Sequence, residues 1–202
     1  MIKKLLGGLF KKENIEEPNF IMATINDKIM PIDRGEIYED PLDELLIEEN
    51  IGEVSGGGTM QGKTGEIDYV DIEIKLNGTK IDKTVINKII EKLENLGAPK
   101  GSVMTVEKTQ EKINFGKLEG IRIYLDGTNL PENVYKECDI NFVITEVHRL
   151  TETEYIVNRD WENENGIALY FYGQSFEKMK TQIKDFVESY PLCENCIIEQ
   201  IA

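Results

Sequence analysis

The sequence predicts an α+β protein of two tandem ferredoxin-like (βαββαβ) units, each an antiparallel sheet with its helices on one face. Three observations favour this class: segments with strand-like alternation interleave with segments of helical spacing, both halves show one order of segments, and 202 residues suffice for two small domains. We expect a basic leader at 1–18, one unit at 19–108, a linker at 108–117 and a second unit at 117–202.

The first half contains the six segments of one unit. A helix start is indicated by Asp40, by Pro41 at the first helical position and by acids in the first turn. A later helix has apolar residues three and four positions apart, and Gly97 with Pro99 ends it. We expect a loop or short strand at 27–33. The six segments are strand 20–25, helix 40–49, extended 52–59, strand 69–76, helix 82–96 and strand 102–107.

The second half repeats this order. Gly78 and Pro99, which flank the long helix of the first half, correspond to Gly173 and Pro191 in the second. Ser175 is the expected cap of the last helix. We therefore expect an internal structural repeat. Its segments are strand 120–125, helix 131–138, strand 140–147, strand 166–172, helix 175–190 and strand 196–201.

Charge and composition limit the function. Asp and Glu number 38 against 23 Lys and Arg, and the first twelve residues hold four lysines and no acid. This negative field repels nucleic-acid phosphates, so we expect no nucleic-acid partner and favour a basic protein partner. Nowhere does the chain approach the roughly 18 consecutive apolar residues of a transmembrane segment. The leader lacks a cleavage site and the three cysteines are few and odd in number, so we expect a cytoplasmic protein.

Two acidic stretches are the candidate partner-binding residues. The first runs from Glu36 to Glu53 without an intervening Lys or Arg, and the second surrounds the single tryptophan. The alternatives are a solvated face and, for the tryptophan, a cap over the core. An EF-hand spacing is missing from the first stretch, and acids at a helix start already favour the helix dipole. The candidates are Glu36, Glu39, Asp40, Asp43, Glu44, Glu48, Glu49, Asp160, Trp161 and Glu162.

A small-molecule site is the alternative. Consecutive glycines let backbone amides approach an anion, and a nearby lysine would add a cation. The Lys-Ser/Thr of a Walker loop does not follow them, and a bulge or a close backbone approach explains glycines between strands equally well. The residues of this alternative site are Gly56, Gly57, Gly58, Lys100 and Ser102.

Catalytic and metal sites are not expected. Cys193 and Cys196 form a C-x-x-C after a helix rather than at its start, so the dipole that activates a redox thiol is missing. A zinc site would need both of them, with only Cys138 and His148 left to complete it. We place His148 late in a strand, where no serine or cysteine nucleophile setting accompanies it. We therefore expect no cofactor and lean against an enzyme.

Three runs carry a resemblance: 32–46 (IDRGEIYEDPLDELL), 52–59 (GEVSGGGT) and 96–102 (LGAPKGS). They resemble a group of small bacterial proteins, some of which resemble immunity proteins of toxin systems. The resemblance covers the first half of the chain and implies a non-enzymatic inhibitor that occludes a basic partner. By fold analogy, the alternative is an ACT-like regulatory protein that senses a small molecule. Exposed sheet edges in such units often pair, so a homodimer is one assembly we consider.

Overall fold

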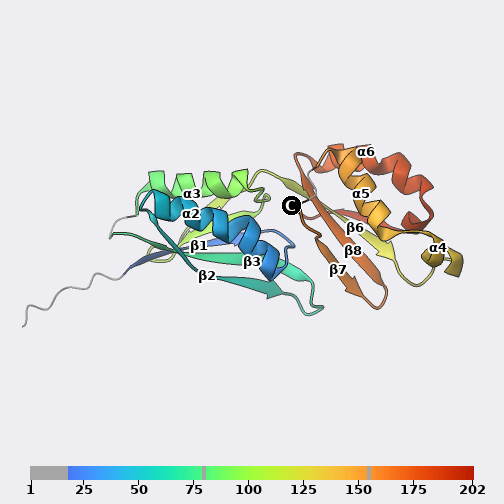
Figure 1. Ribbon diagram of the computed structural model, residues 1–202, viewed down its shortest axis with the longest axis horizontal. Coiled ribbons are helices and arrows are strands. Elements are labelled where there is room, and N and C mark those ends of the chain that lie inside the picture. The colour runs from blue at the N-terminus through green and yellow to red at the C-terminus, as the bar shows by residue number, and fades with distance from the viewer. Residues whose placement is uncertain (1–17, 79–80, 154–155) are drawn as a thin grey trace, which may run out of the picture.

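The structure is a computed structural model that describes residues 18–78, 81–153 and 156–202. Within these residues the strands form one antiparallel sheet of five and one of four, and helices pack on one face of each sheet (Figure 1). The predicted α+β class with two tandem ferredoxin-like units is confirmed. Most of the predicted basic leader, 1–17, lies outside the described residues.

The first sheet has β1 near its centre, paired with β3 on one side and β4 on the other. Buried and half-buried residues alternate along β1, as the period of a strand with one core face requires. The order β2-β3-β1-β4 is that of a βαββαβ unit, and β5 adds an outer strand. The strands are β1 (Asn19–Ile25), β2 (Gly52–Gln61), β3 (Ile67–Leu76), β4 (Ser102–Val106) and β5 (Glu111–Phe115).

The second sheet repeats the first four positions. Its order β7-β8-β6-β9 matches β2-β3-β1-β4 strand for strand, so the internal repeat expected from the sequence is present in the fold. The strands are β6 (Glu119–Asp126), β7 (Asp160–Asn163), β8 (Gly166–Gly173) and β9 (Ile197–Gln200).

The longer helices begin at side-chain caps and bury one apolar stripe. Asp82, Asp139 and Ser175 each accept a hydrogen bond from a backbone amide in the first turn of the helix that follows. Every helix among the described residues is too short or too polar to cross a bilayer. The helices are α1 (Pro31–Arg34), η1 (Gly35–Glu39), α2 (Asp40–Glu48), α3 (Lys83–Asn95), α4 (Glu132–Glu137), α5 (Ile140–Thr151), α6 (Phe176–Ser189) and η2 (Pro191–Cys193).

The predicted strand at 140–147 is wrong, because this segment is the first part of α5. A short apolar run fits the period of a strand or of a helix. Here Asp139 caps the start of a helix, because its side chain accepts a 2.8 Å hydrogen bond from the amide of Asn141. The edge strand beside β8 is instead β7. The predicted linker at 108–117 contains β5, and the segment expected as a loop or strand at 27–33 overlaps the start of α1.

A buried ion pair joins the two units. Arg159, from the loop before β7, donates hydrogen bonds of 2.7 and 2.9 Å to the two carboxylate oxygens of Asp27, which is fully buried. The hydroxyl of Tyr38 donates a third, 2.9 Å long, to the same carboxylate. Nearby, the hydroxyl of Tyr170 in β8 donates a 2.5 Å hydrogen bond to the carboxylate of Glu66, next to β3. The three hydrogen bonds to Asp27 compensate its desolvation, and the contacts of Arg159 and Tyr170 hold the second unit against the first.

Candidate functional site

Helices α1, η1 and α2 run on without a break from Pro31 to Glu48. The π-helical η1 lets a single rod bury Tyr38, Leu42 and Leu46, which are four residues apart and fully buried. Residues two positions away from these lie on the opposite face of the helix. That face points to solvent.

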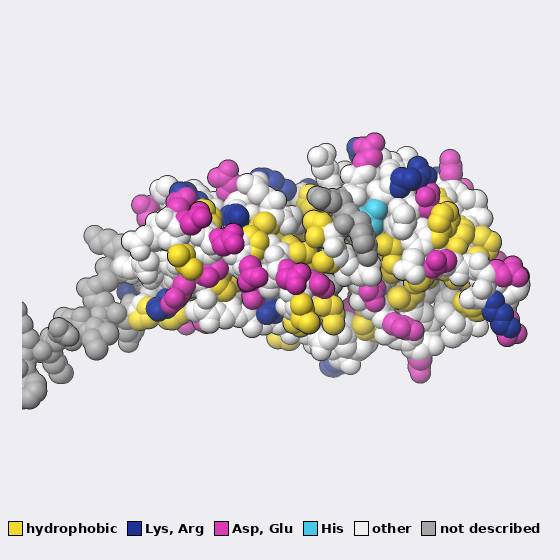
Figure 2. Space-filling model, viewed as in Figure 1, with side chains coloured by type: hydrophobic (Ala, Val, Ile, Leu, Met, Phe, Trp, Pro, Cys, Tyr) yellow, Lys and Arg dark blue, Asp and Glu magenta, His cyan; other side chains and the backbone are white. Residues whose placement is uncertain are grey.

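Four carboxylates follow this outer face at intervals of four residues. We call Glu36, Asp40, Glu44 and Glu48 the acidic ridge; all four are exposed. At 1.5 Å per residue, neighbours along the ridge are about 6 Å apart. Among the residues that the structure describes, none of the four forms an ion pair or a side-chain hydrogen bond. In Figure 2 acidic side chains run across the face of the first unit that α2 covers, with hydrophobic side chains among them.

The other predicted acids of this stretch make contacts within the fold. Glu39 is bound by Arg34 at 2.6 Å, and Arg34 also donates to the hydroxyl of Thr59 in β2. The carboxylate of Asp43 accepts a 2.7 Å hydrogen bond from the amide of Val54, also in β2. Glu49 pairs with Lys88 of α3, and Glu53 pairs with Lys75 at 2.7 Å. These four carboxylates fix the helix and the sheet edge, whereas the ridge is unused by the fold.

Exposed aliphatic side chains lie around the ridge. Ile32 and Ile47, near the two ends of the helical rod, are 78% and 61% exposed, and Met30, next to the start of the rod, is about half exposed. Aliphatic side chains this exposed carry no packing role in the monomer, and protein interfaces place such groups within a polar rim. Sequence reasoning missed these residues, although apolar residues on the polar face of an expected helix were a usable signal.

The second predicted acidic stretch lies in β7, an edge strand of the second sheet. Asp160 and Glu162 are exposed, and Trp161 is half-buried. A Cβ atom placed on Gly65, in the turn after β2, would lie 4.0 Å from the indole nitrogen of Trp161. The tryptophan therefore lies against the first unit, close to the junction.

The alternative glycine-centred residues are not brought together. Gly56, Gly57 and Gly58 lie in β2, whereas Ser102 begins β4, and β3 and β1 separate these strands. The hydroxyl of Ser102 donates a 2.6 Å hydrogen bond to the carbonyl of Pro99 inside the turn. Lys100 forms a 2.7 Å ion pair with Glu119.

Gly57 has a packing role. A Cβ there would lie 2.2 Å from the Glu39 carboxylate and 3.0 Å from the carbonyl of Asp71, so glycine admits the Arg34–Glu39 pair against the strand. The register of β2 shifts between Val54 and Gly56, which is the bulge considered from the sequence.

The cysteines and the histidine lie away from the ridge. The backbone amide of Cys196 donates a 3.1 Å hydrogen bond to the carbonyl of Cys193 in a tight turn. Burial raises the pKa of the Cys193 thiol to about 12. Among the described residues no cluster of His, Cys, Asp and Glu could hold a metal ion. The strand position predicted for His148 is wrong: it lies in α5, 2.9 Å from the hydroxyl of Thr153. Burial lowers its pKa.

Comparison with known proteins adds little to this geometry. No protein-family model and no curated protein matches the chain. Among solved structures, the chain is similar to an unknown protein from Galdieria sulphuraria, at 10% sequence identity and a TM-score of 0.28, with 92% of this chain and 98% of that chain covered. A similarity at this level supports no inference about function.

Proposed function

We propose that this chain is a non-enzymatic binding protein whose acidic ridge and surrounding aliphatic side chains occlude a basic protein partner, as an immunity or inhibitor protein does. The observation that carries the proposal is the ridge itself. Its four carboxylates are exposed, and no described cation neutralises them, whereas the neighbouring acids are consumed by contacts within the fold.

The ridge and its aliphatic surroundings divide the work of binding. A row of like charges on a chain of net charge -15 attracts a basic surface over the Debye length, about 8–10 Å, and raises the association rate. Ile32 and Ile47 then supply apolar area that leaves water on contact. Charge thus governs how fast the complex forms, and apolar burial governs how slowly it separates.

A matched pair of variants tests the proposal. In the ridge variant Glu36, Glu44 and Glu48 become Gln and Asp40 becomes Asn. The control variant makes four Glu→Gln changes at exposed acids elsewhere that form no ion pair with any described residue: Glu111, Glu137, Glu177 and Glu194. Both variants gain the same charge, so they differ only in where it changes.

Each immobilised variant is exposed to host extract at low salt, and the proteins eluted by raised salt are identified. We expect the wild type and the control variant to retain one basic protein in stoichiometric yield and the ridge variant to lose it. Equal retention by the ridge variant, or loss from both variants alike, would contradict a role for the ridge.

A further inference from the structure

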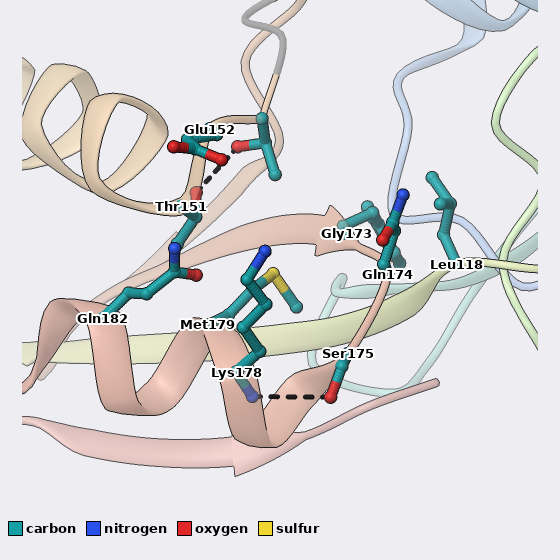
Figure 3. A pocket seen from close by; sticks show the side chains of 11 residues that line it. Leu118, Thr151, Glu152, Gly173, Gln174, Ser175, Lys178, Met179 and Gln182 are labelled. Atoms are coloured by element: carbon teal, nitrogen blue, oxygen red, sulfur yellow. Dashed lines mark hydrogen bonds between the residues drawn. The ribbon is translucent and has the colours of Figure 1, made fainter.

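A cavity of about 270 Å³ lies in the second unit, beside the segment that joins the two sheets. Its walls come from the end of α5, the first turns of α6 and the loop between β8 and α6, and Leu118 closes the side toward the first unit (Figure 3). The volume is just below the range of about 300–1,000 Å³ typical of ligand pockets. It suits a small metabolite.

The cavity has a carboxylate on one wall and an ammonium group on another. Glu152 follows the last residue of α5 in a left-handed conformation, with φ 54°. Lys178 lies in the first turn of α6, and Figure 3 shows its side chain reaching into the cavity. No described residue forms an ion pair with either of these two side chains. Both charges are therefore available to a ligand.

The helix ends reinforce this polarity on one side. The carbonyl end of α5 carries partial negative charge and favours a cation next to Glu152. At the start of α6, the amide of Phe176 already donates to Glu119 and that of Lys178 to the hydroxyl of Ser175. An anion on this wall would therefore be bound by the Lys178 side chain rather than by these backbone amides.

Gln182 lines the same cavity. It lies one turn after Lys178, and its amide group lies toward Thr151 in Figure 3. Its side-chain oxygen is inaccessible to solvent and has no hydrogen-bond partner among the described residues. A ligand atom needs as much room as a water molecule, so this oxygen is out of reach of a ligand in the cavity.

We propose that this cavity binds a small zwitterion, whose ammonium group contacts Glu152 and whose carboxylate contacts Lys178. The site lies in the second unit, whereas the acidic ridge belongs to the first. It goes beyond the proposed function and does not depend on it. It also differs in every residue from the glycine-centred alternative drawn from the sequence.

The test is a titration of the full chain, labelled with ¹⁵N, with ω-amino acids from glycine to 6-aminohexanoate. Pentanoate and butylamine serve as singly charged analogues. We expect an amino acid of one chain length to shift the NMR signals of the Gln182 side-chain amide and of the Gly173 and Ser175 backbone amides saturably. The singly charged analogues should bind at least about tenfold more weakly. Lys178→Met and Glu152→Gln should each weaken binding by about tenfold, while Lys180→Met, an exposed lysine outside the cavity, should leave it unchanged.

Three outcomes would overturn the proposal. The first is the absence of saturable shifts with every member of the series up to about 20 mM. The second is equal binding of the singly charged analogues. The third is unchanged affinity in both the Lys178 and Glu152 variants, whose folding is checked by the remaining amide signals.

Discussion

Replacing Arg159 with Met would leave the carboxylate of Asp27 fully buried with the Tyr38 hydroxyl as its remaining donor among these groups. Arg159 supplies two of the three hydrogen bonds that this carboxylate accepts there, at 2.7 and 2.9 Å. Removing one partner of a buried pair costs about 3–5 kcal/mol, because the other charge stays desolvated. Since domains unfold with about 5–15 kcal/mol, the variant should lose a large part of the total stability.

The double variant Asp27→Leu with Arg159→Met separates the cost of an orphaned charge from the value of the pair. With both charges gone, the expected loss is well below that of Arg159→Met alone, because an apolar pair at such a site is often close to neutral. Its Tyr38 hydroxyl then loses its acceptor, which accounts for a residual loss of about 1–3 kcal/mol.

Urea denaturation followed by Trp161 fluorescence measures these differences. Trp161 is the single tryptophan and lies against Gly65 of the first unit, so its emission reports on the junction between the units. Circular dichroism reports the secondary structure of both units in parallel. A loss below about 1 kcal/mol for Arg159→Met, or a double variant less stable than the single one, would refute the reasoning.

Two further predictions concern the first sheet and the histidine. Gly57→Ala should destabilise the chain by about 1–3 kcal/mol in urea denaturation, because its Cβ would lie 2.2 Å from the Glu39 carboxylate. The control is Gly58→Ala, whose Cβ meets no described atom within 4 Å and which should change stability by about 0.5 kcal/mol or less. Equal effects of the two substitutions would contradict this packing. His148 should titrate below 6.5 in a proton NMR titration, because burial, with a smaller effect of Arg159, lowers its pKa. As the pH falls, His148 is protonated in the unfolded chain before it is protonated in the folded one. The contribution of the neutral ring to folding stability is therefore complete above about pH 6.5 and is lost as the pH falls through that value toward the folded pKa. A measured pKa of 6.5 or higher would contradict the burial of the ring.

The regular elements were predictable where one period dominates. Residues 69–76 alternate strictly and form part of β3, and 82–96 has helical spacing and contains α3. The segment 140–147 misled because its apolar residues are dense enough to fit either period. The strand expected there is β7, a short edge strand of mostly polar residues that carries little hydrophobic signal.

The candidate surface was predictable as a charged stretch but not in detail. Sequence alone grouped all the acids from 36 to 53. The structure separates them by helical phase, because Glu36, Asp40, Glu44 and Glu48 lie opposite the buried face, whereas Glu39 and Asp43 face β2. The phase was readable from the spacing of the apolar residues, but the partners of the inward acids depend on a strand that follows the helix.

The inter-unit ion pair could not have been predicted. Asp27 and Arg159 are 132 positions apart, and neither lies in a segment with a regular hydrophobic period. Their contact depends on how the two sheets are placed against each other, which local sequence does not determine. The cavity beside α6 depends in the same way on the close approach of two helices in the second unit.

The most direct test of the central claim is the association rate of the captured basic partner as a function of ionic strength, measured for the wild type, the ridge variant and the control variant. We expect the wild-type rate to fall steeply as salt rises, the ridge variant to associate slowly with a shallow salt dependence, and the control variant to follow the wild type closely. A wild-type rate that does not change with ionic strength, or a ridge variant with the wild-type salt dependence, would contradict binding through the acidic ridge.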